Sequence, residues 1–186
     1  MIAKALVLLV VCSAVLSAQP THKRLKVIRL STDARTRYEK SAEQSLQDLH
    51  KDLQPCHTDD QSDSWLVDYR ACLYQHLKDA DRDYLTYESS VRMLYLDASE
   101  MEKVEIEIFL PEMTRTFDQA ADAWRSYRKT ECRAEAAVFE GGTAAVEAEP
   151  YCNLLLIKQR ASAMCTSFMG KSADDPECDF SKAVGE

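Results

Sequence analysis

The residues best suited to chemistry lie together in the stretch WRSYRKTEC, residues 124–132. Its nine positions hold two aromatic rings, three cations, one carboxylate and one cysteine. Such a dense set of reactive groups could form a binding site, a catalytic centre or a piece of scaffold. The element that carries the stretch decides between these interpretations.

On an α-helix, this stretch gathers its aromatic residues on one side. At about 100° per residue, Trp124, Tyr127, Arg128, Glu131 and Cys132 fall within an arc of about 140°. The sequence therefore predicts that both rings face the core, with Arg128 among them. A half-buried guanidinium group needs an acidic partner, which is either Glu131 or an acid on another helix. Most of the set is then scaffold. The same arc holds Met113, Phe117, Ala120 and Ala121.

The rest of the chain offers no catalytic set. His57 begins a polar loop that could bind a metal weakly, although a solvated turn is the commoner structure, and His76 on an apolar face is more often a core residue. The sequence has no glycine-rich phosphate loop, GxSxG motif or HExxH motif. We expect no enzyme activity, no cofactor and no metal site.

Helices are the elements that must position these residues. Only four glycines and five prolines interrupt the chain, which favours long helices over many-turned sheets. Apolar residues at helical spacing predict helices over residues 32–54, 65–77 and 112–140, and a last one from near Pro150. The second helix either ends near residue 77 or continues to residue 95, because the same spacing extends that far. Residues 104–109 alternate like a strand but also fit a helix or linker. The predicted fold is all-α: three to four long antiparallel helices stapled by disulfides.

The first residues are typical of an export signal. A basic start, the apolar run 5–15 and a small-residue cut before Gln19 predict a signal peptide over residues 1–18, and the run is short for a membrane span. Residues 9–12 faintly resemble a lipoprotein box, but Val11 is bulky there, so anchoring through Cys12 is not expected. The mature protein is expected in the periplasm or outside the cell, without a transmembrane segment. The expected parts are a loose leader over 19–31, a helical domain over 32–169 and a polar tail over 170–186 pinned by a disulfide.

Six cysteines remain after removal of the signal. An even number in an exported chain favours disulfides over thiols, and six cysteines permit 15 pairings. A bridge between Cys132 and Cys152 would tie a helical hairpin across the turn at Gly141 and Gly142. The same neighbour pairing predicts the bridges Cys56–Cys72 and Cys165–Cys178.

The charge of the chain limits its partners. The formal net charge is −8, and phosphates repel an acidic protein, so nucleic acid is not an expected partner. A basic protein suits this charge because complementary charges speed encounter. Plain solubility also explains many acidic proteins.

The helical stretch and the cysteines together resemble a known family, the LprI-type lysozyme-inhibitor domain of bacterial envelope proteins. The resemblance covers residues 56–168. It departs from the family in the loop after Gly142, in the extra cysteines 165 and 178, and in the absence of a typical lipoprotein anchor. The matching residues are Trp124, Tyr127, Arg128 and Cys132; Gly141, Gly142 and Thr143; Cys152 and Arg160; and, upstream, Cys56, Cys72, Asp83 and Tyr87.

The resemblance implies an exported binding protein that inhibits lysozyme or a related cell-wall hydrolase. The expected contact is the acidic loop over residues 140–149, where an ordinary exposed connection is the alternative. A second hypothesis is an envelope or secreted structural protein with a different protein partner, and a third is an enzyme of unrecognised type. The expected contact residues are Glu140, Gly141, Gly142, Thr143, Glu147 and Glu149.

Overall fold

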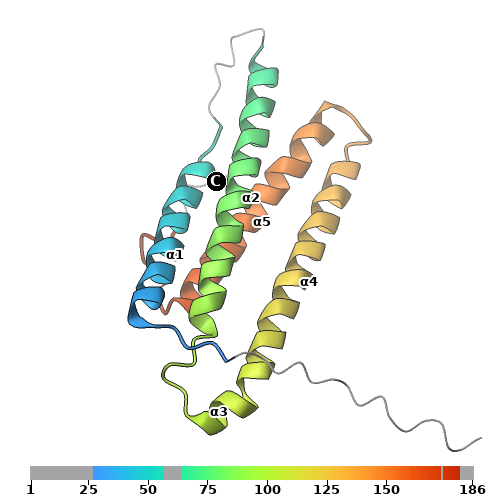
Figure 1. Cartoon of the computed structure of the whole chain (residues 1–186). Helices are drawn as coiled ribbons and strands as arrows, with labels where there is room; N and C mark the ends of the chain where they lie inside the picture. Colours follow the sequence, from blue (N-terminus) through green and yellow to red (C-terminus); the bar gives the residue numbers. More distant parts are fainter. Residues whose placement is uncertain (1–26, 57–63, 173, 181–186) are drawn as a thin grey trace, which may run out of the picture.

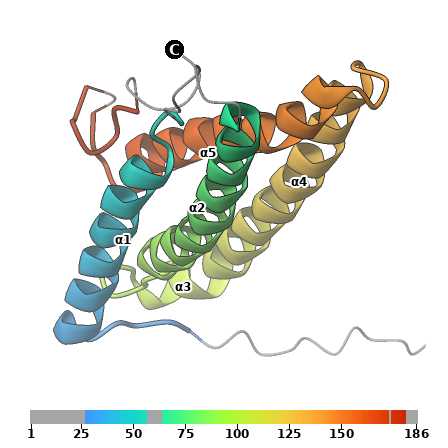
Figure 2. The same cartoon turned by 90° about the horizontal axis from the view of Figure 1, so that it is seen from above.

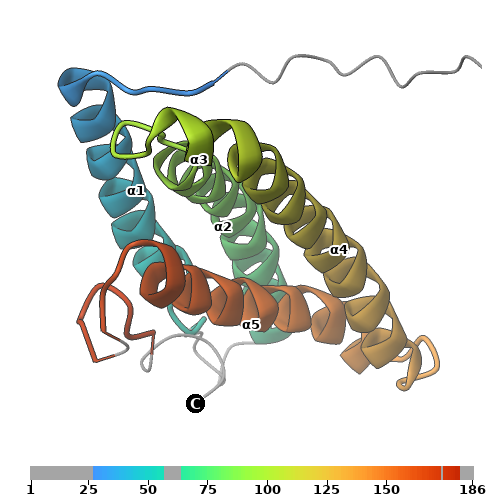
Figure 3. The same cartoon turned by 90° about the horizontal axis from the view of Figure 1, so that it is seen from below.

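The computed structural model describes residues 27–56, 64–172 and 174–180, and this part of the chain contains five helices and no strand. The predicted all-α bundle is confirmed. Consecutive long helices run in opposite directions, and α3 forms one end of the bundle (Figure 1). The helix α5 crosses the other long helices obliquely (Figures 2 and 3). The helices are α1 (Thr32–Asp52), α2 (Trp65–Tyr95), α3 (Lys103–Ile108), α4 (Leu110–Ala137) and α5 (Thr143–Phe168).

Local signals set several of the helix ends. The hydroxyl of Ser31 accepts a hydrogen bond from the backbone N–H of Ala34 and caps α1. Glu102 and Glu105 form a reciprocal capping box at the start of α3. The ambiguous segment 104–109 is therefore helical over its first five residues, and the strand alternative is wrong.

The main core lies between α1, α2 and α5. Its largest fully buried side chains include Tyr84 and Tyr87 of α2, Leu46 of α1, and Leu154 and Met164 of α5. The helix α4 is more peripheral: it packs closely on α5, whereas long side chains bridge it to α2. This arrangement leaves a seam between α2 and α4 that polar groups can occupy.

A second, smaller cluster closes the α3 end of the bundle. Ile106 and Leu110 pack there with Leu96 and Ala98, and Ile28 covers them. The backbone carbonyl of Ile28 accepts a hydrogen bond from the N–H of Ala98 at 2.9 Å. Residues 27–31, at the end of the expected leader, are thus tied to the bundle. Residues 1–26, including the predicted signal, Cys12 and the rest of the leader, lie outside the described residues.

Three disulfides join the pairs that neighbour pairing predicts. Cys56 bonds to Cys72, Cys132 to Cys152 and Cys165 to Cys178. The second bridge links α4 to α5 and is buried, so it fixes the base of the hairpin that these helices form. Closing a loop of this length contributes on the order of 3 kcal/mol in the chain-entropy model.

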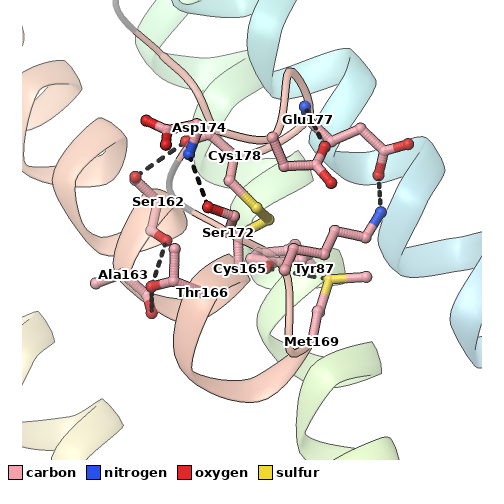
Figure 4. The surroundings of a disulfide bond; sticks show 12 residues. Tyr87, Ser162, Ala163, Cys165, Thr166, Met169, Ser172, Asp174, Glu177 and Cys178 are labelled. Atoms are coloured by element: carbon pink, nitrogen blue, oxygen red, sulfur yellow. Dashed lines mark hydrogen bonds and ion pairs between the residues drawn. A yellow bond between two sulfur atoms is a disulfide. The ribbon is translucent and has the colours of Figure 1, made fainter.

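The third disulfide brings the C-terminal segment back onto the bundle (Figure 4). The hydroxyl of Ser162 donates to the carbonyl of Cys178 at 3.0 Å. The ring of Phe180 stacks on His50 of α1 at 4.0 Å between centroids. Cys178 and Phe180 are buried in the main core, so this segment extends the core although its composition is polar.

The carboxyl groups of Asp52 on α1 and Asp83 on α2 are neighbours where the end of α1 meets α2. Oδ2 of Asp52 is buried. Burial first, then the side-chain hydrogen bond with Asp83, and then the charges of Asp83 and Asp79 raise the pKa of Asp52 from 3.8 to about 7, although the charge of Arg82 lowers it. The folded protein therefore holds a proton on Asp52 that the unfolded chain releases near pH 4.

This proton makes stability depend on pH. Between about pH 4 and pH 7 the folded state binds the extra proton, so stability falls as the pH rises through this window. Asp52→Asn imitates the protonated form and should raise the melting temperature relative to the unsubstituted chain more at pH 8 than at pH 5. Circular dichroism melts at both pH values measure this. The control is Asp174→Asn, which removes an exposed charge; a parallel response of the two variants would contradict the assignment.

Candidate functional site

The predicted contact loop is shorter than expected, because α5 begins at Thr143 rather than near Pro150. A proline inside a helix lacks the N–H that would bond the carbonyl four residues earlier, here that of Val146. The hydroxyl of Tyr74 on α2 donates to this carbonyl at 3.4 Å. A tertiary contact thus satisfies the group that Pro150 leaves free, and the helix continues through the proline.

Only residues 138–142, the hairpin tip, connect α4 to α5 outside the helices. Glu140 and Gly141 have φ values of 49° and 78°. The left-handed conformation costs a non-glycine residue about 1–3 kcal/mol, so Glu140 is held under strain. No atom lies within 4 Å of a Cβ built on Gly141, so its backbone conformation, not lack of space, favours glycine there.

The six expected contact residues divide into two groups. Five are exposed: Glu140, Gly141 and Gly142 at the tip, and Thr143 and Glu149 in the first turns of α5. Glu147 is different, since its carboxylate pairs with Arg70 of α2 at 3.1 Å. Arg70 also donates to the carbonyl of Thr143 at 3.2 Å. This clip makes Glu147 part of the support of the hairpin tip.

Apolar side chains also lie at this end of the hairpin, and the sequence interpretation missed them. Val138 and Phe139 are 76% and 46% exposed, and Val146 and Tyr74 are exposed nearby. The sequence does contain a signal for them, because Val138 and Phe139 stand just before Gly141 and Gly142, where a turn is expected and apolar residues are unusual. Exposed apolar groups with acidic neighbours are typical of protein contact surfaces.

The motif residues of WRSYRKTEC build the seam between α2 and α4 rather than the tip. The Trp124 ring packs against Tyr84 at 4.8 Å between centroids, and the Arg128 guanidinium lies over Trp124 at 5.1 Å. Nη1 of Arg128 is 2.7 Å from Oδ1 of Asp81 on α2. Of the two partners left open by the sequence, the acid on another helix is therefore correct, and Glu131 is exposed.

Tyr127 does not face the core, contrary to the prediction, because its side chain is 52% exposed. The helix α4 lies at the edge of the bundle and packs on neighbours along one side only. Its buried arc is therefore narrower than the 140° arc assumed from the sequence. Trp124 and Arg128 lie within this arc, whereas Tyr127 lies beyond it.

Tyr84 is the polar centre of this region. Its hydroxyl donates to Oε2 of Glu88 at 2.8 Å and lies 3.6 Å from Sδ of Met164. Burial raises the pKa of Tyr84, and the charge of Glu88 adds to this, while Arg160 of α5 lowers it. Arg160 of the family motif therefore influences the same hydroxyl.

Ion pairs continue along the seam between α2 and α4. Oε1 of Glu88 accepts a hydrogen bond from Arg125, which also pairs with Asp122 at 2.7 Å. An open groove of about 440 Å³ lies beside this network, with Phe117 and Ala121 of α4 among its lining. Its charged groups are already paired with one another. From one end to the other, the cross-helix pairs are Asp81–Arg128, Glu88–Arg125 and Arg92–Asp118.

The sulfur atoms of Cys56 and Cys72 and one ring nitrogen of His76 lie within 4.8 Å of one another. A metal site would need thiolates, and these two sulfurs are bonded to each other. His76 instead lies 3.1 Å from the carbonyl of Gln54, so the group serves as a structural joint between the end of α1 and α2.

The seam predicts a specific loss of stability in Glu88→Gln. The neutral amide weakens the hydrogen bond from Arg125 and leaves less acceptor capacity for Tyr84, so the free energy of unfolding should fall by about 1–3 kcal/mol. Urea denaturation measures this. The control is Glu131→Gln, an exposed change on α4 that should stay within about 0.5 kcal/mol of the unsubstituted chain. Equal values for the two variants would show that the network adds nothing.

Comparison with known proteins places this geometry in a family. The model of the family described as "Lysozyme inhibitor LprI" matches residues 56–164, more than half of the chain. This range holds the motif of α4, the hairpin tip and the first two disulfides, whereas α1 and Cys178 lie outside it. No curated protein and no solved structure matches the chain. The resemblance seen in the sequence is thus confirmed: the chain belongs to the LprI lysozyme-inhibitor family.

Proposed function

We propose that this protein is an exported, non-enzymatic inhibitor of lysozyme or a related cell-wall hydrolase. The observation that carries the proposal is the family match over residues 56–164. The family is one of inhibitors rather than catalysts, and the groove between α2 and α4 holds paired ions instead of a free acid, base or nucleophile with an orienting partner.

Export agrees with the disulfides of the described residues. Three bridges in one small domain suit an oxidising compartment. No helix in the described ranges is long and apolar enough to span a bilayer. We propose that residues 1–18 direct the chain to the periplasm or the medium, and that Cys12 is removed with them.

Charge supports a hydrolase of the lysozyme type as the partner. The chain carries a formal charge of −8, and such enzymes are typically basic, so attraction over several ångströms speeds their encounter. Their cleft works through two carboxyl groups flanking the scissile bond. An inhibitor therefore needs only to cover this cleft and does not need to react.

We infer that the hairpin tip is the part that covers the cleft. Phe139 offers an apolar ring and Glu140 a carboxylate, next to each other at the end of a long hairpin. The Arg70 clip and the Cys132–Cys152 bridge hold the base of this tip. A preordered tip loses less conformational entropy on binding than a loose loop, which favours tight association with a small contact area.

A turbidity assay tests the proposed function directly. The purified chain from Gln19 onward, with its disulfides intact, is added to a basic lysozyme and a suspension of bacterial cell walls. Lysis should slow as the protein is added and approach zero at molar excess. Undiminished lysis at a large excess over several lysozyme types would overturn the proposal, and a specific envelope partner of another class would then favour the structural alternative.

Substitutions at the tip test its role separately. The double variant Phe139→Ser with Glu140→Gln should raise the concentration needed for half inhibition by about tenfold or more, which corresponds to about 1.4 kcal/mol of binding free energy. Glu43→Gln, an exposed change on α1, is the control and should inhibit like the unsubstituted chain. If the tip variant inhibits fully and the unsubstituted chain does too, another surface makes the contact.

A further inference from the structure

The helix α3 and its C-cap residue Phe109 also expose apolar side chains, far from the hairpin tip. Val104, Ile108 and Phe109, here called the α3 face, are 63%, 60% and 54% exposed. The opposite side of the same segment carries Ile106 and Leu110, which are buried in the second core cluster. The segment is therefore apolar on both sides, but only the side with Ile106 and Leu110 is buried within the protein. An exposed apolar group of this kind marks a contact surface.

Acidic side chains surround the α3 face. Residues 97–112 contain six acidic residues and one lysine, a formal charge of −5 out of −8 for the whole chain. Asp97 and Glu112 have arginine partners, whereas Glu100, Glu102 and Glu107 are exposed and make no ion pair with another described residue. This end of the bundle thus combines an apolar centre with a negative rim.

The α3 face is remote from the hairpin tip. The helix α4 connects the two and has 28 residues, which corresponds to about 42 Å at 1.5 Å per residue. The two surfaces lie at opposite ends of the bundle (Figure 1). A protein bound at the tip therefore leaves the α3 face open, and the two surfaces can bind different partners.

We propose that the α3 face docks a cationic amphipathic peptide segment. The apolar side of such a segment covers Val104, Ile108 and Phe109, while its lysine or arginine side chains meet Glu100, Glu102 and Glu107. Binding of an amphipathic helix on an apolar strip follows this pattern in many complexes. Pairing at an exposed rim adds selectivity and a faster encounter rather than most of the affinity.

Charge separates this partner from the other candidates. A second copy of the chain would bring a region of charge −5 against an identical one, which is repulsive. An anionic membrane surface repels the same rim. The basic residues 23, 24 and 26 of this chain, which lie outside the described residues, are complementary as well, so the experiment must separate them from an external peptide.

The test measures binding of a synthetic peptide by isothermal titration calorimetry. The probe is an amphipathic helix of about four turns built from leucine and lysine, and the control peptide has glutamate in place of lysine. The oxidised chain from Gln19 onward should bind the lysine peptide only. The affinity should fall when the ionic strength rises from about 50 to about 300 mM, because salt screens the rim charges.

Matched variants locate the site. Val104→Ser, Ile108→Ser and Phe109→Ser together should weaken binding at least about tenfold, and Glu100→Gln with Glu107→Gln should weaken it about threefold to tenfold at low salt. The controls are Val67→Ser with Leu85→Ser, which alter exposed apolar residues of α2, and Glu131→Gln with Glu135→Gln, which remove the same charge from α4. All should bind like the unsubstituted chain, and every variant should retain lysozyme inhibition.

Three outcomes would overturn the proposal. Equal losses in the α3 variants and the controls would show attraction to net charge alone. Self-association in sedimentation, lost in the α3 variants, would make this face a contact between copies. Binding that tightens at least about tenfold in a chain starting at Val27 would show that residues 19–26 occupy the face. Because inhibition is measured separately, failure here leaves the function proposed for the tip unaffected.

Discussion

The buried hydroxyl of Tyr84 is the constraint around which the bundle is arranged. A polar group without access to water needs a partner, and here Glu88, Met164 and Arg160 surround the oxygen from two helices. The hydrogen bond from Tyr84 holds the carboxylate of Glu88 in the seam between α2 and α4, and Arg125 of α4 pairs with this carboxylate. The hydroxyl of Tyr84 thus links α2 directly to α5, and links α2 to α4 through Glu88 and Arg125.

This arrangement separates support from contact. Trp124 and Arg128 of the family motif hold α4 against α2, and Arg128 pairs with Asp81 of α2. Exposed apolar side chains with acidic neighbours lie near each end of α4: Val104, Ile108 and Phe109 before it, and Val138 and Phe139 after it. This arrangement suits binding, because the long helix α4 holds the two exposed surfaces at a fixed distance from each other.

The sequence predicts the features that depend on local periodicity. It does not predict the features that depend on a contact with another helix. The long helices follow from the spacing of apolar residues. The three disulfides agree with the assumption that neighbouring cysteines pair, although the sequence permits 15 pairings. The start of α5 does not, because Tyr74 of another helix satisfies the carbonyl that Pro150 leaves free. The prediction for Tyr127 is wrong because the width of the buried side of a helix depends on how many helices pack against it, and the sequence of α4 does not show that number. The partner of Arg128 is likewise on another helix and has no signal in the local sequence. Two features do have a local signal: the capping box of Glu102 and Glu105 at the start of α3, and the apolar pair Val138 and Phe139 before the two glycines.

The disulfide pattern has a consequence for how the chain matures. Each bridge joins a cysteine to the next one along the chain, with separations of 16, 20 and 13 residues. In the export that we propose above, the N-terminal part of the chain emerges first, so each bridge can close as soon as its second cysteine emerges and before the next pair appears. Sequential oxidation of this kind would give the observed pairs without reshuffling of bonds, a step that takes seconds to hours depending on the oxidant and the isomerase.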